Sequence, residues 1–100
     1  MMTSLIKIEI TSLAQHFSTR PIGVLSREKL LKYLADADSI EIDFEKQSLT
    51  PSFADECIGV LAFMLGLEEF KRRVKLTNFD ESSRPLLRHV VLKRCSEVKL

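Results

Sequence analysis

Ser52, a serine just ahead of an apolar helical pattern, is the residue best placed to do chemistry in this chain. Its hydroxyl can cap the helix by accepting from the backbone N–H of Asp55, and the Asp55 carboxylate can reach back to the N–H of Ser52. Such a helix start presents free N–H groups and the positive end of the helix dipole. The spacing therefore predicts either a pure N-cap or a cap that also serves binding or regulation.

Other polar residues follow the predicted strands. The carboxyl ends of parallel strands share one edge of a sheet, and ligands of open α/β sheets usually bind there. Asp43 could hold a cation, orient Ser52 or simply face solvent, and Arg20 could bind an anion, although a structural salt bridge with Asp43 is the favoured interpretation. The residues expected at this partner or ligand edge are Arg20, Asp43, Thr50, Pro51, Ser52, Asp55, Glu56, Asn78 and Ser82.

A catalytic triad and a metal site have almost no support in the sequence. His16 and His89 lie far apart, with no nucleophile or carboxylate at a recognisable spacing. Cys57 and Cys95 each sit inside an apolar helical pattern, without a second ligand nearby, and are interpreted as small core residues. We therefore expect no enzymatic activity, no cofactor and no bound transition metal.

The composition argues for one ordinary globular domain over residues 1–100. Apolar side chains make up 45% of the chain and charged ones 29%. Fifteen basic and fourteen acidic residues leave a net charge of +1, which argues against binding nucleic acid or a membrane surface through bulk charge. No apolar run approaches the length of a membrane span and no signal-peptide pattern is present, so we expect a cytoplasmic protein.

Hydrophobic periodicity predicts the elements that must position these residues. Alternating apolar residues indicate strands at 5–10, 39–44 and 74–79, and apolar stripes indicate helices at 26–36, 52–65 and 83–96. Residues 18–21 and Gly23 are interpreted as a break and a turn, with Ser26 capping the first helix. The alternation of strands and helices predicts an α/β fold with a small, mainly parallel sheet of three to four strands packed with about three helices. The direction of the first strand stays open.

The helix at 52–65 is apolar around most of its circumference, which predicts burial on more than one face. We expect four of its side chains in the core: Phe53, Cys57, Leu61 and Met64. The helix at 26–36 has a narrower apolar stripe, and four of its charged residues are expected to face water: Arg27, Glu28, Lys32 and Asp36.

The strand end Ile42-Asp43-Phe44, followed by a short loop and Thr50-Pro51-Ser52-Phe53-Ala54-Asp55-Glu56, resembles the STAS-like family of bacterial domains of unknown function. The stretches 19–23 and 74–78 also fit that family, so the resemblance covers roughly residues 5–95. It implies a single STAS-like domain.

Members of this family are similar to STAS domains proper, including the anti-sigma-factor antagonists. In those proteins a partner kinase phosphorylates a serine at the start of the corresponding helix and so switches binding off. Ser52 occupies the matching place, although the antagonists carry Asp-Ser-Ser-Gly there, whereas Pro51 precedes and Phe53 follows Ser52 in this chain.

The resemblance thus implies a regulatory protein-interaction module in a bacterial cytoplasm. Its partner would be a histidine-kinase-like ATPase of the anti-sigma type. The alternative is a small-ligand or nucleotide-sensing domain using the same carboxyl edge of the sheet. The oligomeric state stays open.

Overall fold

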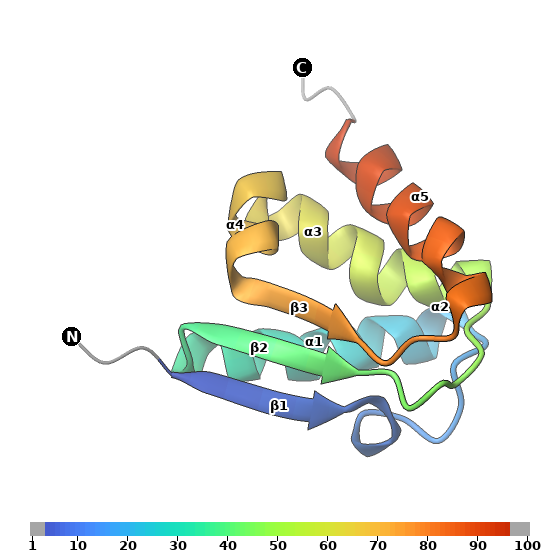
Figure 1. Ribbon diagram of the computed structural model, residues 1–100, viewed down its shortest axis with the longest axis horizontal. Helices are drawn as coiled ribbons and strands as arrows, with labels where there is room; N and C mark the ends of the chain where they lie inside the picture. The colour runs from blue at the N-terminus through green and yellow to red at the C-terminus, as the bar shows by residue number, and fades with distance from the viewer. Residues whose placement is uncertain (1–3, 97–100) are drawn as a thin grey trace.

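Three parallel strands, in the order β1-β2-β3, form the sheet of the computed structural model, which describes residues 4–96 (Figure 1). The strands are β1 (Leu5–Glu9), β2 (Ser39–Asp43) and β3 (Val74–Thr77). The residue numbers of the paired positions rise together, from Leu5 with Ser39 to Glu9 with Asp43, so the first strand is parallel to the second. Strand β2 is likewise parallel to β3. The predicted α/β fold is confirmed, and each strand ends one or two residues earlier than predicted.

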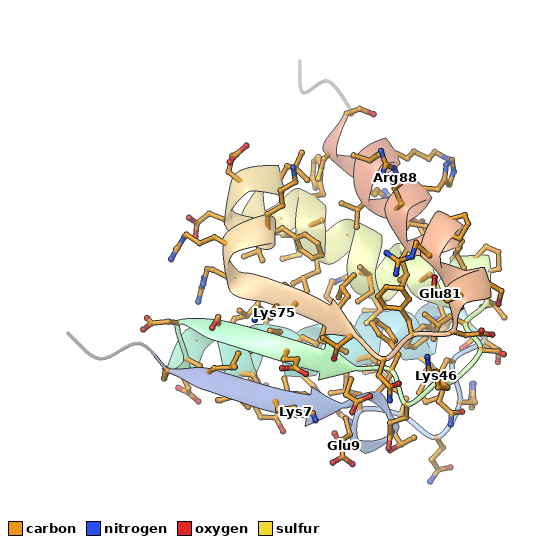
Figure 2. All side chains as sticks on the ribbon, viewed as in Figure 1. Lys7, Glu9, Lys46, Lys75, Glu81 and Arg88 are labelled. Atoms are coloured by element: carbon orange, nitrogen blue, oxygen red, sulfur yellow. The ribbon has the colours of Figure 1, made fainter. Side chains whose placement is uncertain are left out.

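The helices cover one face of this sheet. Both crossovers step in the same direction, from β1 to β2 and from β2 to β3, which places both connections on the same side. Ile8 and Ile42 point into the core and are buried. Lys7, Glu41 and Lys75 lie side by side in the register on the other face, where opposite charges alternate across the strands (Figure 2).

Helix α1 (Arg20–Asp36) begins six residues earlier than predicted. The Thr19 side chain caps it by accepting from the backbone N–H of Ile22 at 3.4 Å, and Pro21 lies in the first turn, where its missing N–H costs nothing. The predicted break at 18–21 is therefore a helix start. Ser26 is not a cap: it lies inside α1, its side chain is fully buried, and its hydroxyl has no hydrogen-bond partner among residues 4–96.

Gly23 is not in a turn but in a close contact between helices. A Cβ atom at this position would lie 2.9 Å from the Cβ of Glu56 and 3.1 Å from the carbonyl oxygen of Phe53. Real Cβ atoms do not approach so closely, so glycine lets α1 pack directly against the next helical segment.

The predicted helix at 52–65 is present as a continuous helical stretch of three parts. These are α2 (Pro51–Ala54), a π-helical turn η2 (Asp55–Gly59) and α3 (Val60–Leu65). Phe53, Cys57 and Leu61 are fully buried, as predicted, but Met64 is 55% exposed, so its predicted burial is wrong. The wider π turn changes the angle between successive residues, and the buried face that an ideal α-helix predicts does not continue to Met64.

The rest of the chain completes the helical layer. A 3₁₀ turn, η1 (Ile10–Ser12), directly follows β1. The last elements of the helical layer are α4 (Leu67–Arg73), a second 3₁₀ turn, η3 (Glu81–Ser83), and α5 (Arg84–Cys95). The predicted helix at 83–96 is confirmed. Helix α4 is not among the three helices that the periodicity predicts. Arg73 holds α4 to the end of α1 by donating to the carbonyl oxygens of Leu34, Ala37 and Asp38. None of the helices in the described part of the chain is long and apolar enough to cross a membrane.

Leu61 and Met64 give a matched test of this packing. Leu61→Ala should lower the free energy of unfolding by about 2–5 kcal/mol, because it leaves a cavity beneath α3. Met64→Ala should change it by less than about 0.5 kcal/mol, because Met64 is mostly in solvent. Urea denaturation measures both, and equal losses would contradict the placement of the two side chains.

Candidate functional site

Thr50, not Ser52, caps the start of α2. The Thr50 Oγ1 accepts a hydrogen bond from the backbone N–H of Phe53 at 3.2 Å. Pro51 takes the first helical position, where proline is favoured, and this moves the cap to the residue before it. Ser52 is therefore inside the first turn and half-buried. Its predicted capping box with Asp55 is wrong, and its hydroxyl makes no hydrogen bond to any residue the structure describes.

The loop that precedes α1 holds this helix start in place. The backbone N–H of Thr50 donates to the carbonyl oxygen of Phe17 at 3.1 Å. The Phe17 ring meets the Phe53 ring edge to face, with centroids 5.5 Å apart. The starts of α1 and α2 consequently lie near each other, at the end of the molecule toward which the strands point (Figure 1).

Arg20 joins these two helix starts through ion pairs. Its guanidinium lies 2.9 Å from an Asp55 carboxylate oxygen and 3.1 Å from a Glu56 carboxylate oxygen. The predicted salt bridge between Arg20 and Asp43 is therefore wrong. The Arg20 side chain stays 52% exposed, so it reaches both carboxylates from solvent.

Two further arginines complete what we call the arginine–carboxylate network, which comprises Arg20, Arg27, Asp55, Glu56 and Arg94. Arg94 of α5 binds Asp55 with two parallel hydrogen bonds of 2.8 and 2.7 Å. Arg27 of α1 lies 3.2 Å from the Glu56 carboxylate and also donates to the Glu56 carbonyl oxygen. The network thus ties α1 and α5 to the π turn that carries both carboxylates.

The π turn positions Asp55 at the contact with α5. The backbone N–H of Val60 donates to the carbonyl oxygen of Asp55, an i to i+5 bond that defines the wider turn. At Gly59 a Cβ atom would lie 3.0 Å from both an Asp55 carboxylate oxygen and the carbonyl oxygen of Val90. A side chain at this position would force these neighbours to shift by a few tenths of an ångström, so glycine allows the close approach of α5.

Arg94 sets the electrostatics of Asp55. Its two hydrogen bonds, with a smaller contribution from Arg20, outweigh the effect of partial burial and lower the pKa of Asp55 to about 2. The Asp55 carboxylate is therefore charged throughout the physiological range.

Asp43, the last residue of β2, and Asn78, which directly follows β3, form a separate group. The Asp43 carboxylate accepts from the backbone N–H of Glu45 at 2.8 Å and from the Asn78 side-chain amide at 3.0 Å, and Lys7 lies 3.7 Å away. The Glu45 hydrogen bond, followed by that of Asn78, lowers the pKa of Asp43. Asn78 has a positive φ of 52°. The hydrogen bonds of Asp43 thus hold two turns together, and none of them goes to Ser52.

Sequence reasoning missed Arg27 and Arg94. A helix predicted to start at Ser26 placed Arg27 on its water-facing side, whereas its side chain is only 15% exposed. In a helix that starts at Arg20, Arg20 and Arg27 are seven residues apart and lie on one face. This spacing is the signal that could have identified Arg27. For Arg94 we see no local signal, because its partner is 39 residues away.

The chemistry available at this site is recognition by charge and by hydrogen bonding. Within residues 4–96 no three His, Cys, Asp or Glu side chains are grouped so that they could hold a metal ion. The nearby Cys57 thiol is buried, which raises its pKa to about 12 and keeps it protonated. At the helix starts Arg20 is half exposed and Ser52 is partly exposed, so both side chains are accessible to a partner.

Thr50 and Ser52 give a test of the cap. Thr50→Ala should lower the free energy of unfolding by about 1 kcal/mol, because the Phe53 N–H loses its acceptor. Ser52→Ala should change it by less than about 0.5 kcal/mol, because alanine favours a helix and no hydrogen bond is lost. Thermal or urea denaturation decides between the two residues, and a larger loss for Ser52→Ala would restore Ser52 as the cap.

Asp55 should make the free energy of unfolding depend on pH. Its pKa is about 2 when folded and about 3.8 when unfolded, so the unfolded state binds the proton first as the pH falls. Its contribution, on the order of 2 kcal/mol, is fully present above about pH 5 and is lost progressively toward pH 2. Urea denaturation at several pH values should show Asp55→Asn less stable than the wild type at pH 7 and nearly equal at pH 2.

The exposed pair of Glu69 and Arg72 supplies the control for this measurement. Glu69→Gln removes a carboxylate whose side chain is 48% exposed, so the stability should change little at any of these pH values. A pH profile of Asp55→Asn that runs parallel to the wild-type profile would contradict the assigned pKa.

A comparison with known protein families, curated proteins and solved structures identifies the family of this chain. No curated protein and no solved structure matches it. A family model described as the STAS-like domain of unknown function (DUF4325) matches residues 23–84. That range contains the strand end at Asp43, the start of α2 and both carboxylates of the network. The chain therefore belongs to the family of STAS-like domains of unknown function.

Proposed function

We propose that this chain is a bacterial, cytoplasmic regulatory module that binds a protein partner through the surface around Pro51–Glu56 and is switched at Ser52. The observation that carries the proposal is the Ser52 hydroxyl. It lies in the first turn of a helix and has no hydrogen-bond partner within residues 4–96, so its modification would break no bond within that range. Membership of the STAS-like family supports a regulatory role.

The surroundings of Ser52 favour a switch by phosphate. A phosphoserine adds a charge of about −1.5 to −2 and three strong acceptor oxygens. The helix dipole stabilises this charge at the start of α2, so the fold should survive the modification. Asp55 and Glu56 lie three and four residues further along the same helix face and repel the phosphate.

Arg20 is the group that would respond. It is half exposed and already bridges Asp55 and Glu56 at the same helix start. A phosphate on Ser52 would compete with these carboxylates for the guanidinium, because arginine binds phosphate in the same two-pronged geometry. Phosphorylation would then change both the charge of the surface and the pairing of Arg20, while Arg94 would keep holding Asp55.

The partner that we propose is a histidine-kinase-like ATPase of the anti-sigma type, which would both bind the module and phosphorylate Ser52. In this scheme the unmodified form binds the ATPase and the phosphorylated form is released. Charge repulsion accounts for the release if the partner surface is acidic.

The test uses the purified chain and an anti-sigma-type ATPase from the same genome. After incubation with Mg-ATP, mass spectrometry should find phosphate on Ser52. Calorimetry should show binding weakened about tenfold or more by Ser52→Asp and unchanged within about threefold by Ser52→Ala. Ser48→Asp is the matched control, since it adds the same charge at an exposed position of the preceding loop and should leave binding unchanged.

The proposal has a clear contrary result. If both Ser52 variants bind the ATPase with the wild-type affinity within about twofold, and protein from native cells carries no phosphate on Ser52, then this serine is no switch.

A further inference from the structure

A groove of about 340 Å³ lies between α4, the end of β3 and α5. Its apolar lining includes Phe70 of α4, Leu76 of β3, and Leu87 and Val91 of α5. Phe70, Leu87 and Val91 are at most 8% exposed, so they form a floor continuous with the core. None of the residues that the sequence predicted for the partner edge lines this groove, which is thus separate from the Ser52 surface.

The charged residues of the groove are all basic. Lys71 comes from α4 and Arg88, which is labelled in Figure 2, comes from α5, so the two cations lie on different walls of the groove. Neither makes a hydrogen bond or an ion pair with any residue in the described range. Arg84 also lines the groove, but Glu81 neutralises it with two hydrogen bonds of 3.0 and 3.1 Å.

The spacing along α5 produces this combination of floor and rim. Leu87 and Val91 are four residues apart and lie on one face of the helix, and Arg84 and Arg88 form the neighbouring row with the same spacing. The Arg84 guanidinium stacks over the Phe79 ring, 4.9 Å from its centroid, and so forms part of the wall. The result is an apolar trough with two uncompensated positive charges beside it.

We propose that this groove binds a free amphiphilic carboxylate, such as a medium-chain fatty acid. The hydrocarbon tail would cover the floor at Phe70, Leu87 and Val91, and the carboxylate would lie between Lys71 and Arg88. Its volume is at the small end of the range of ligand pockets, which suits one tail with one head group. The basic rim selects the sign of that head group.

An NMR titration with sodium decanoate, below its critical micelle concentration, tests the site directly. The amide signals of Phe70, Leu87 and Val91 should shift on binding. Lys71→Gln and Arg88→Gln should each weaken binding about three- to tenfold, and the double variant more than tenfold. Lys75→Gln is the matched control, because Lys75 is an exposed lysine on the uncovered face of the sheet, and it should leave binding unchanged within about twofold.

Two analogues separate the head group from the tail. Decanol, without a charge, should bind more weakly than decanoate, and decylamine, with a positive charge, should bind least. Three results would each overturn the proposal: no shift of the groove signals at about 1 mM decanoate, decylamine binding as tightly as decanoate, or full affinity in the double variant. Groove signals that respond to an acidic amphipathic peptide but not to decanoate would also overturn it, because they would assign the groove to a protein partner.

Discussion

The close packing of the helical stretch 51–65 against α1 on one side and α5 on the other is the constraint on which the rest of the structure depends. Two glycines permit it, since a Cβ at Gly23 would meet Glu56 and one at Gly59 would meet Asp55 and Val90. Glycine inside a helix lowers its stability by about 1 kcal/mol relative to alanine. The apolar surface that is buried between the closely packed helices offsets this loss. The same approach brings three arginines within reach of two carboxylates.

The network and the groove are both consequences of this packing. Asp55 holds α5 near its C-terminal end through Arg94, and the same helix supplies Leu87, Arg88 and Val91 to one wall of the groove. On the other side Arg20 joins the starts of α1 and α2, where Ser52 lies. One buried helix therefore positions Ser52 at one end of the network and, through Arg94, holds the helix that forms one wall of the groove at the other.

The sequence predicts the strands and the buried helix well, because each depends on a local apolar period that the fold preserves. The predictions fail where the same residues are compatible with two local structures. Thr19-Arg20-Pro21 is predicted to break a helix but forms a capped helix start, and Pro51 moves the cap from Ser52 to Thr50. Met64 is misplaced because a π turn has no periodic signature in the sequence. The pairing of Asp55 with Arg94 and the groove beside α5 depend on packing between distant segments, which no local pattern encodes.

The most direct test of the account follows the arginine side chains by NMR in a chain carrying phosphoserine at position 52. The account predicts that the chemical shift of the Arg20 Nε–H changes, because the phosphate draws the Arg20 guanidinium away from Asp55 and Glu56. The chemical shift of the Arg94 Nε–H should stay at its wild-type value. An Arg20 signal that does not change on phosphorylation would contradict the coupling between Ser52 and the network.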